Sequence, residues 1–155
     1  MQKGASRALD ALLERESPDP VYLLHGDNEF LKDEAIRAIV ARFTDKGTRD
    51  FNFEILHGSE TDPARLATAL DALPMLGARR VVVIRDLPGL KKDARAVLDR
   101  YLKRPASDTL LVLVAPAEAK VVLETSTVSR IEFANPEGAD RAAGITQNRW
   151  RILES

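Results

Sequence analysis

The amino-acid sequence predicts an α/β fold with three layers, in which a parallel sheet of about five strands carries helices on both faces. Three observations lead to this prediction. Short apolar runs alternate along the chain with amphipathic stretches of helical length, which is the pattern of strand–helix–strand units. Several of these runs contain no polar residue, as at residues 81–84 and 110–114, which is typical of strands buried on both faces. The 155 residues are enough for one core, and 45% of them are hydrophobic.

The first part of the chain is predicted to contain two helices and one strand. A helix is expected over residues 5–15, with leucines along one face, and a strand is expected over residues 21–24. Asp27 or Asn28 can cap the helix that follows, and Lys46-Gly47 is expected to end it. The apolar residues of this second helix have the spacing of one buried face: Ile36, Ile39, Val40 and Phe43.

The middle of the chain adds a strand and a helix. The strand is expected over residues 51–56. The helix begins at Asp62-Pro63, with proline at its first helical position, and Pro74 is expected to end it. Its apolar face is predicted to consist of Leu66, Leu70 and Leu73.

Three further strands and one helix complete the predicted fold. The strands are expected at residues 81–84, 110–114 and 128–133. The last helix is expected to stop near Pro105, and its apolar stripe consists of Ala94, Val97, Leu98, Tyr101 and Leu102. The folded unit is expected to span residues 1–135, because residues 136–155 are too few to form a second core.

Composition excludes several classes of function. The sequence has no cysteine, which excludes disulfides, thiolate zinc sites, iron–sulfur clusters and cysteine nucleophiles. Only two histidines, His25 and His57, are present, which leaves little material for a metal centre or a histidine relay. No apolar window approaches the length of about 18 residues that a membrane-spanning helix needs, and the N-terminus has no apolar signal core. The expected location is therefore the cytoplasm.

Charge is unevenly distributed along the chain. Residues 79–104 contain nine Lys or Arg and three Asp, whereas the whole chain has a net charge of −1. This basic block could face a polyanion or an acidic protein, but such blocks more often form a solvated helix face, and we favour that interpretation. Contact with DNA is expected to be weak at most, because Tyr101 is the only aromatic residue in the block.

The turn after the first predicted strand lies where open parallel sheets bind ligands. A phosphate-binding loop there needs several glycines and a Lys followed by Ser or Thr. This turn has one glycine, Gly26, and its Lys32 is followed by Asp33. Acidic residues also exceed basic ones by three over residues 25–34, which opposes binding of a polyphosphate. The sequence therefore predicts no bound nucleotide, and no other cofactor or metal is expected.

Asp86 follows the third predicted strand, where nucleotide-hydrolysing enzymes keep a magnesium-binding Asp. Because the upstream Lys and hydroxyl pattern is missing, we interpret Asp86 as a turn or helix-capping residue. Asp27 and Asp86 also suit a phospho-accepting receiver domain, but Asn28 stands where that chemistry needs a second acid. A nucleotide-binding or phospho-accepting α/β domain is therefore kept as the alternative function.

The sequence contains no recognisable catalytic motif, which favours a binding module over an enzyme. Residues 73–77 read Leu73-Pro74-Met75-Leu76-Gly77 and connect a predicted helix to the third predicted strand. An adjacent apolar pair on a tight connection is either packed under the sheet edge or presented to a partner. The usual burial of apolar residues slightly favours the packed position, and the sequence leaves both open.

Several motifs in the same order resemble a known family. They are residues 21–31 (VYLLHGDNEFL), 51–53 (FNF) and 73–84 (LPMLGARRVVVI), followed by Tyr101-Leu102, Pro105 and residues 109–113 (TLLVL). Over residues 5–134 the chain resembles the N-terminal domain of the delta subunit of bacterial DNA polymerase III, part of the clamp loader. The resemblance implies a RecA- or AAA+-like, P-loop-type domain without a functional P-loop.

The family resemblance also implies a function. In that family the apolar pair of the loop inserts into a hydrophobic pocket on the sliding clamp, the beta subunit, and helps to open it for loading onto DNA. The implied clamp-binding residues are Leu73, Pro74, Met75 and Leu76. No catalytic activity of its own is expected, although as a holoenzyme subunit such a protein is classed with the DNA-directed DNA polymerases, which are nucleotidyltransferases. Residues 136–155 would begin a helical lid domain, and the other loader subunits would be contacted through further C-terminal domains that this chain lacks.

Overall fold

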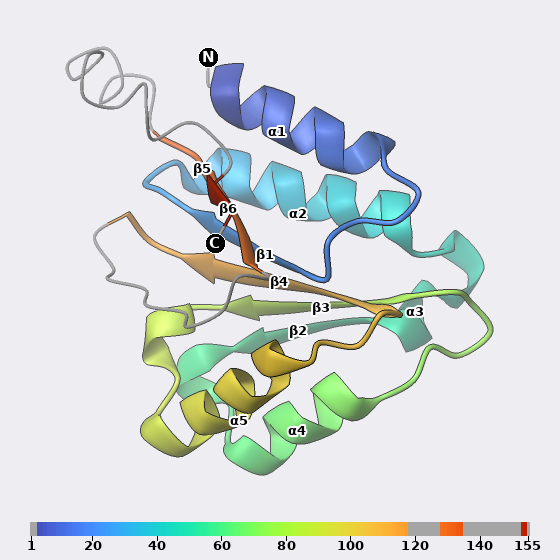
Figure 1. The fold of residues 1–155 in the computed structure, drawn as a ribbon, viewed down its shortest axis with the longest axis vertical. Helices are drawn as coiled ribbons and strands as arrows, with labels where there is room; N and C mark the ends of the chain where they lie inside the picture. Colours follow the sequence, from blue (N-terminus) through green and yellow to red (C-terminus); the bar gives the residue numbers. More distant parts are fainter. Residues whose placement is uncertain (1–2, 118–127, 135–152, 155) are drawn as a thin grey trace.

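Five parallel strands form the centre of the described structure, and a short antiparallel strand extends the sheet at one edge (Figure 1). The computed structural model describes residues 3–117, 128–134 and 153–154. The strands follow the order β2-β3-β4-β1-β5-β6 across the sheet. Their bounds are β1 Val21–His25, β2 Phe53–His57, β3 Arg80–Arg85, β4 Thr109–Ala115, β5 Val128–Glu132 and β6 Leu153–Glu154. The predicted parallel sheet of about five strands is confirmed.

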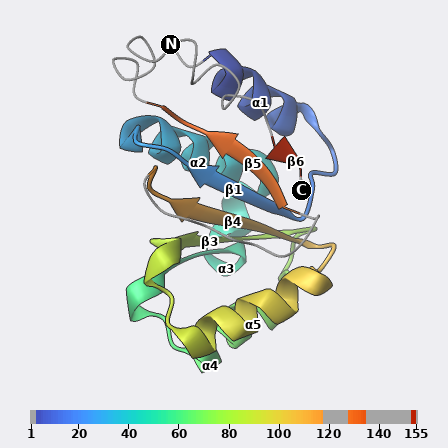
Figure 2. The ribbon, with the colours of Figure 1, turned by 60° about the vertical axis from the view of Figure 1, so that its left-hand side comes forward.

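Helices cover both faces of this sheet, which confirms the three predicted layers (Figures 1 and 2). The helices α1 (Lys3–Glu14) and α2 (Glu29–Phe43) lie on one face, and α4 (Pro63–Asp71) and α5 (Lys92–Lys103) lie on the other. A further short helix, α3 (Arg49–Asn52), lies at one end of the sheet.

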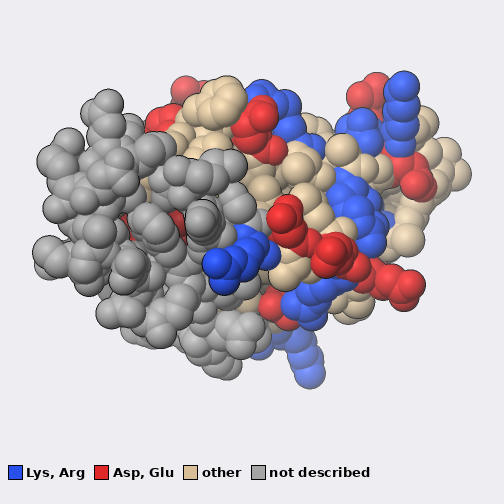
Figure 3. Space-filling model, turned by 90° about the horizontal axis from the view of Figure 1, so that it is seen from above, with Lys and Arg blue, Asp and Glu red and all other residues tan. Residues whose placement is uncertain are grey.

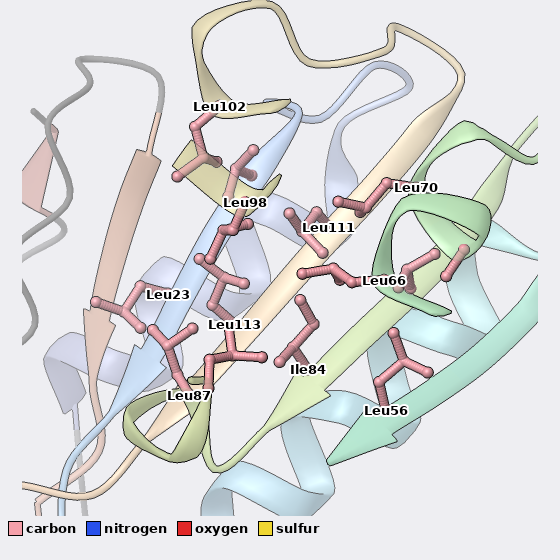
Figure 4. Packing of buried hydrophobic residues seen from close by; sticks show 14 of the residues in the cluster. Leu23, Leu56, Leu66, Leu70, Ile84, Leu87, Leu98, Leu102, Leu111 and Leu113 are labelled. Atoms are coloured by element: carbon pink, nitrogen blue, oxygen red, sulfur yellow. The ribbon is translucent and has the colours of Figure 1, made fainter. Parts of the chain in front are cut away.

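Alternate residues of each central strand serve two separate apolar clusters. In β1, Tyr22 and Leu24 pack with α1 and α2, whereas Val21 and Leu23 pack with α4 and α5. Figure 4 shows the second cluster, in which leucines of both helices meet the side chains of the strands. Burial on both faces explains why these strands have no alternation of apolar and polar residues.

The helix caps follow the sequence signals closely. The side chain of Asn28, rather than that of Asp27, accepts a hydrogen bond from the Leu31 amide at 3.0 Å and caps α2. Asp62 caps α4 through the Arg65 amide at 2.7 Å, and proline occupies the start of that helix. Each cap satisfies an amide that has no partner within its helix.

The first helix begins two residues earlier than predicted, at Lys3, and three other predicted boundaries are wrong for reasons that the structure shows. The second strand begins at Phe53, because residues 49–52 form the short helix α3. The helix α2 ends at Phe43, before Lys46-Gly47, because both the amide and the hydroxyl of Thr44 bond the Val40 carbonyl and close the last turn. The helix α4 ends at Asp71, so Leu73 is not part of its buried face.

The predicted domain limit at residue 135 and most of the tail lie outside the described residues, apart from the two residues of β6. In the part of the chain that the structure describes, no helix has the length and apolar character needed to cross a bilayer.

Candidate protein-binding loop and the opposite end of the sheet

The connection between α4 and β3 carries the two most exposed large apolar side chains among the described residues. We call residues 73–77 the apolar loop. Its three large apolar side chains are 73% (Leu73), 55% (Met75) and 81% (Leu76) exposed, and Pro74 is half-buried. The interpretation that the pair packs under the sheet edge is therefore wrong. The physical reason is that α4 ends before the loop, which leaves the loop side chains outside the apolar clusters on both faces of the sheet.

The backbone of this loop is fixed by a buried side chain. Asn52, at the end of α3, is 1% exposed, and its Nδ2 donates a hydrogen bond to the Met75 carbonyl at 2.7 Å. Its Oδ1 accepts a hydrogen bond from the Met75 amide, also at 2.7 Å. Both polar groups of one loop residue thus have a partner from a distant part of the sequence. This role of Asn52 was not predicted, because the strand was expected to begin at residue 51.

Two further features describe the loop backbone. Leu76 has a φ of +57°, in the left-handed region that residues other than glycine rarely occupy. A Cβ atom on Gly77 would lie 3.1 Å from the Asn52 Nδ2 atom, so a residue with a side chain at this position would crowd Asn52. The loop therefore turns sharply while staying close to its anchor.

A buried arginine joins the elements around the loop. Arg80, the first residue of β3, is 5% exposed and donates hydrogen bonds to the carbonyls of Phe51 (3.0 Å) and Ala69 (3.4 Å). It also pairs with Glu54 at 3.1 Å, and Glu54 in turn pairs with Arg65. Burial lowers the pKa of the Arg80 guanidinium from its usual value. The network ties α3, β2 and α4 to the start of β3, three residues after the end of the apolar loop.

The apolar loop and the turn after β1 lie at opposite ends of the sheet. The loop precedes β3, whereas the turn follows β1, and the two strands run parallel. In Figure 1 the loop between α4 and β3 lies at the same end as α3. A partner bound to the loop therefore meets the amino ends of the strands, away from the edge where nucleotides bind in related folds.

At the other end of the sheet, the ammonium group of Lys32 is bound by groups of the protein itself. The side chain is 1% exposed, and its Nζ donates to the Ala115 carbonyl at the end of β4 (3.1 Å) and pairs with Glu29 (2.7 Å). Lys32 follows Gly26 at the spacing of a phosphate-binding loop, but Leu31 and Asp33 stand where that loop needs a glycine and a hydroxyl. Asp33 itself pairs with Arg85 at 2.8 Å.

A backbone carbonyl also binds one of the amides of the turn after β1. The Phe133 carbonyl accepts a hydrogen bond from the Asn28 amide at 3.0 Å. A Cβ atom on Gly26, which has a φ of +124°, would lie 2.2 Å from the same oxygen, so only glycine fits there. The adjacent hollow, of about 260 Å³, is lined by Glu29 and Asp86 as well as by Lys32 and Arg85. Both basic side chains thus already pair with a carboxylate and the lining includes two carboxylates, an arrangement poorly suited to phosphate.

Asp86 lines the same hollow as Lys32 but lies in the turn that follows β3. Asp86 has a φ of +54° and directly precedes the short 3-10 helix at Leu87–Gly89, which supports its interpretation as a turn residue. Within the described ranges, no three His, Cys, Asp or Glu side chains are grouped so that they could hold a metal ion.

The basic block is divided between structural and exposed positions. Arg80 is buried and Arg85 pairs with Asp33, whereas the six exposed members lie on or next to α5 together with Asp93 and Asp99. These members are Lys91, Lys92, Arg95, Arg100, Lys103 and Arg104. On the face seen from above in Figure 3, basic and acidic side chains are also interspersed among the described residues.

Comparisons with known proteins give a consistent result. Residues 22–128 match the family model of "DNA polymerase III, delta subunit". A Bacillus subtilis protein, DNA polymerase III subunit delta, is 33% identical over 115 residues, which cover 68% of this chain and 33% of the relative. The chain therefore spans about a third of the length of that curated relative.

Solved structures extend the comparison to the fold. The Bacillus subtilis DNA clamp loader delta protein (YqeN) matches with a TM-score of 0.70 and 22% identity, over 96% of this chain and 48% of that one. A Thermotoga maritima DNA polymerase III, gamma subunit-related protein matches with a TM-score of 0.59 and 18% identity, over 96% and 51%. The Thermotoga maritima RuvB Holliday junction branch migration motor matches at 0.57 and 19%, over 86% and 45%. At these identities the similarity concerns the fold.

Proposed function

Because this chain belongs to the DNA polymerase III delta subunit family, we propose that its apolar loop binds the sliding clamp and helps to open it for loading onto DNA. The observation that carries the proposal is the exposure of Leu73, Met75 and Leu76 on a loop whose backbone is fixed. Exposed apolar side chains that lie together on one loop are typical of a protein-interaction site, whereas single scattered ones are common on any surface.

The chemistry of the loop suits a hydrophobic pocket on the partner. Full burial of a Met or Leu side chain contributes about 1.5–3 kcal/mol, and anchors at the centre of an interface contribute about 2 kcal/mol or more each. Met75 and Leu76 are adjacent in the chain and more than half exposed, so they can enter one pocket together. Phe51, directly before Asn52, is also 53% exposed and adds apolar surface near the anchor of the loop.

Opening of the clamp follows from differential affinity. A bound protein shifts an equilibrium between closed and open rings only to the extent that it binds the open form more tightly. A rigid loop suits this task, because it does not follow the pocket as the clamp closes. The work of the domain is therefore binding, and no catalytic step of its own is required.

The test compares two variants of the chain in a biosensor titration against the sliding clamp of the same organism. The double variant Met75→Ser/Leu76→Ser removes the two apolar anchors. The control, Phe30→Ser, changes a side chain that is 67% exposed in the first turn of α2, at the opposite end of the sheet.

We expect the double variant to weaken clamp binding by roughly a thousandfold, since two anchors together contribute roughly 4 kcal/mol and each 1.4 kcal/mol is a factor of ten. Its denaturation midpoint should barely move, because substitutions of exposed side chains change stability by less than about 0.5 kcal/mol. The control should bind like the original protein. Equal binding by the double variant, or a large loss of its stability, would contradict the proposal.

A further inference from the structure

Asn52 is a buried polar residue whose side-chain amide serves the apolar loop. Its Nδ2 and Oδ1 bond the carbonyl and the amide of Met75, each at 2.7 Å, and a weaker contact joins Nδ2 to the Thr48 hydroxyl at 3.5 Å. The sequence separation between the partners is 23 residues. The Asn52 side chain therefore bonds both backbone groups of Met75 and joins the loop to α3 at the end of the sheet.

An amide is the side chain that this geometry requires. The Met75 backbone offers one donor and one acceptor, and a carboxamide is the small group that presents one of each in a plane. An alanine would satisfy neither group. An ionised carboxylate would accept from the Met75 amide but would face the Met75 carbonyl without a proton to donate.

The conformation of the next residue indicates why such an anchor is needed. Leu76 has a φ of +57°, and a leucine in this region persists only where its surroundings hold it there. The hydrogen bonds from Asn52 hold the residue immediately before Leu76, and the nearby Gly77 leaves room for the Asn52 amide. On this backbone the side chain of Leu76 is 81% exposed.

We propose that Asn52 is a positioning residue, which holds the backbone of the apolar loop in its binding conformation before the partner arrives. The inference rests on the proposed function, since the partner is the sliding clamp. A loop that is ordered beforehand avoids the loss of conformational entropy on binding. Loss of the anchor should therefore weaken binding although Asn52 itself is buried and does not reach the partner.

The experiment uses Asn52→Ala with a matched control, Thr61→Val. Thr61 is also buried, and its hydroxyl bonds the His57 carbonyl at 2.5 Å, but it lies beyond the opposite end of β2. Three quantities are measured for each protein: hydrogen exchange of the Met75 amide, the denaturation midpoint and clamp affinity. We expect Asn52→Ala to speed exchange at Met75 and to weaken clamp binding by about tenfold to a hundredfold, whereas Thr61→Val changes neither.

A second variant keeps the test decisive if Asn52→Ala does not fold. In Asn52→Asp, a protonated carboxyl can donate to the Met75 carbonyl and accept from its amide, and burial favours the protonated form. Clamp binding by Asn52→Asp should thus improve relative to the original protein as the pH falls from about 7.5 to 5.5. The denaturation midpoint of Asn52→Asp is measured at both pH values, and the recovery supports the positioning role only where the variant is folded at pH 7.5 as well, since refolding alone would also restore binding.

The outcomes separate the two proposals. If the original protein binds the clamp and Met75→Ser/Leu76→Ser does not, but both Asn52 variants bind normally, the positioning role is overturned and the proposed function stands. If the original protein fails to bind the clamp, the proposed function fails, and the positioning role for clamp binding fails with it. Fast exchange at Met75 in Asn52→Ala together with weakened binding supports both.

Discussion

Replacing Lys32 tests what this buried lysine contributes at the carboxyl ends of β1 and β4. Its ammonium group has two partners, the Ala115 carbonyl at 3.1 Å and Glu29 at 2.7 Å. The Glu29 side chain is 67% exposed, so the ion pair contributes no more than about 1 kcal/mol. Burial of the ammonium opposes this contribution, because moving a charge out of water costs several kcal/mol before its partners are counted.

The expected free energies differ between two substitutions. Lys32→Met keeps an unbranched stem and removes the charge, so the lost hydrogen bond and the relieved desolvation nearly cancel, and we expect a change within about 1 kcal/mol. Lys32→Ala loses the same hydrogen bond and relieves the same desolvation, but it also removes three buried methylenes, at about 0.8 kcal/mol each, and leaves a cavity. Its expected loss is therefore about 2–5 kcal/mol.

The assay is denaturant unfolding followed by far-ultraviolet circular dichroism, with Glu29→Gln as a control for the ion pair. We expect the original protein, Glu29→Gln and Lys32→Met to have similar denaturation midpoints, and Lys32→Ala to have a much lower one. If Lys32→Met lost as much stability as Lys32→Ala, the reasoning would be refuted. The ammonium, rather than the packed stem, would then be what the fold needs.

Two further predictions concern ligands and pH. Addition of Mg-ATP should leave the thermal midpoint unchanged. If the protein bound the nucleotide, Mg-ATP at 100 times its Kd would raise the free energy of unfolding by about 2.7 kcal/mol. A clear magnesium-dependent rise of the midpoint would favour the alternative of a nucleotide-binding domain. Burial raises the pKa of Tyr101 in the folded state, so this residue contributes stability below its unfolded pKa, near 10, which is lost as the pH rises further. Between about pH 9 and 11, the free energy of unfolding should therefore fall less for Tyr101→Phe than for the original protein. An equal fall for the two proteins would argue against a raised pKa of Tyr101.

The sequence was sufficient to predict the sheet and its layers because the signals for them are local. Apolar runs without polar residues, such as Val81-Val82-Val83-Ile84, indicate strands buried on both faces, and Asp62-Pro63 marks the start of α4 correctly. The boundary errors arise where a side chain competes with the backbone pattern. Thr44 ends α2 earlier than Lys46-Gly47 would, through two bonds to one carbonyl.

The candidate site was predicted only in part. Residues 73–76 were identified from their apolar character and from the family resemblance, but the sequence alone could not decide whether they are buried. That depends on where α4 ends. Asn52 could not be recognised, because its partners are the backbone atoms of Met75, and a backbone contact leaves no mark on the residue types of the loop. The Arg80 network was missed for the same reason, since two of its acceptors are carbonyls.

Anchoring through the backbone has a consequence for how this surface can change over time. Asn52 contacts the amide and carbonyl of residue 75 and makes no demand on its side chain. Substitutions at positions 73 and 75 can therefore alter the size and shape of the protruding group while the path of the chain stays constant, whereas position 76 accepts only residues that tolerate its positive φ. A pocket on a partner and the group that fills it can then diverge together, one residue at a time, without rebuilding the domain. The same property makes the loop a practical site for grafting other short apolar recognition sequences.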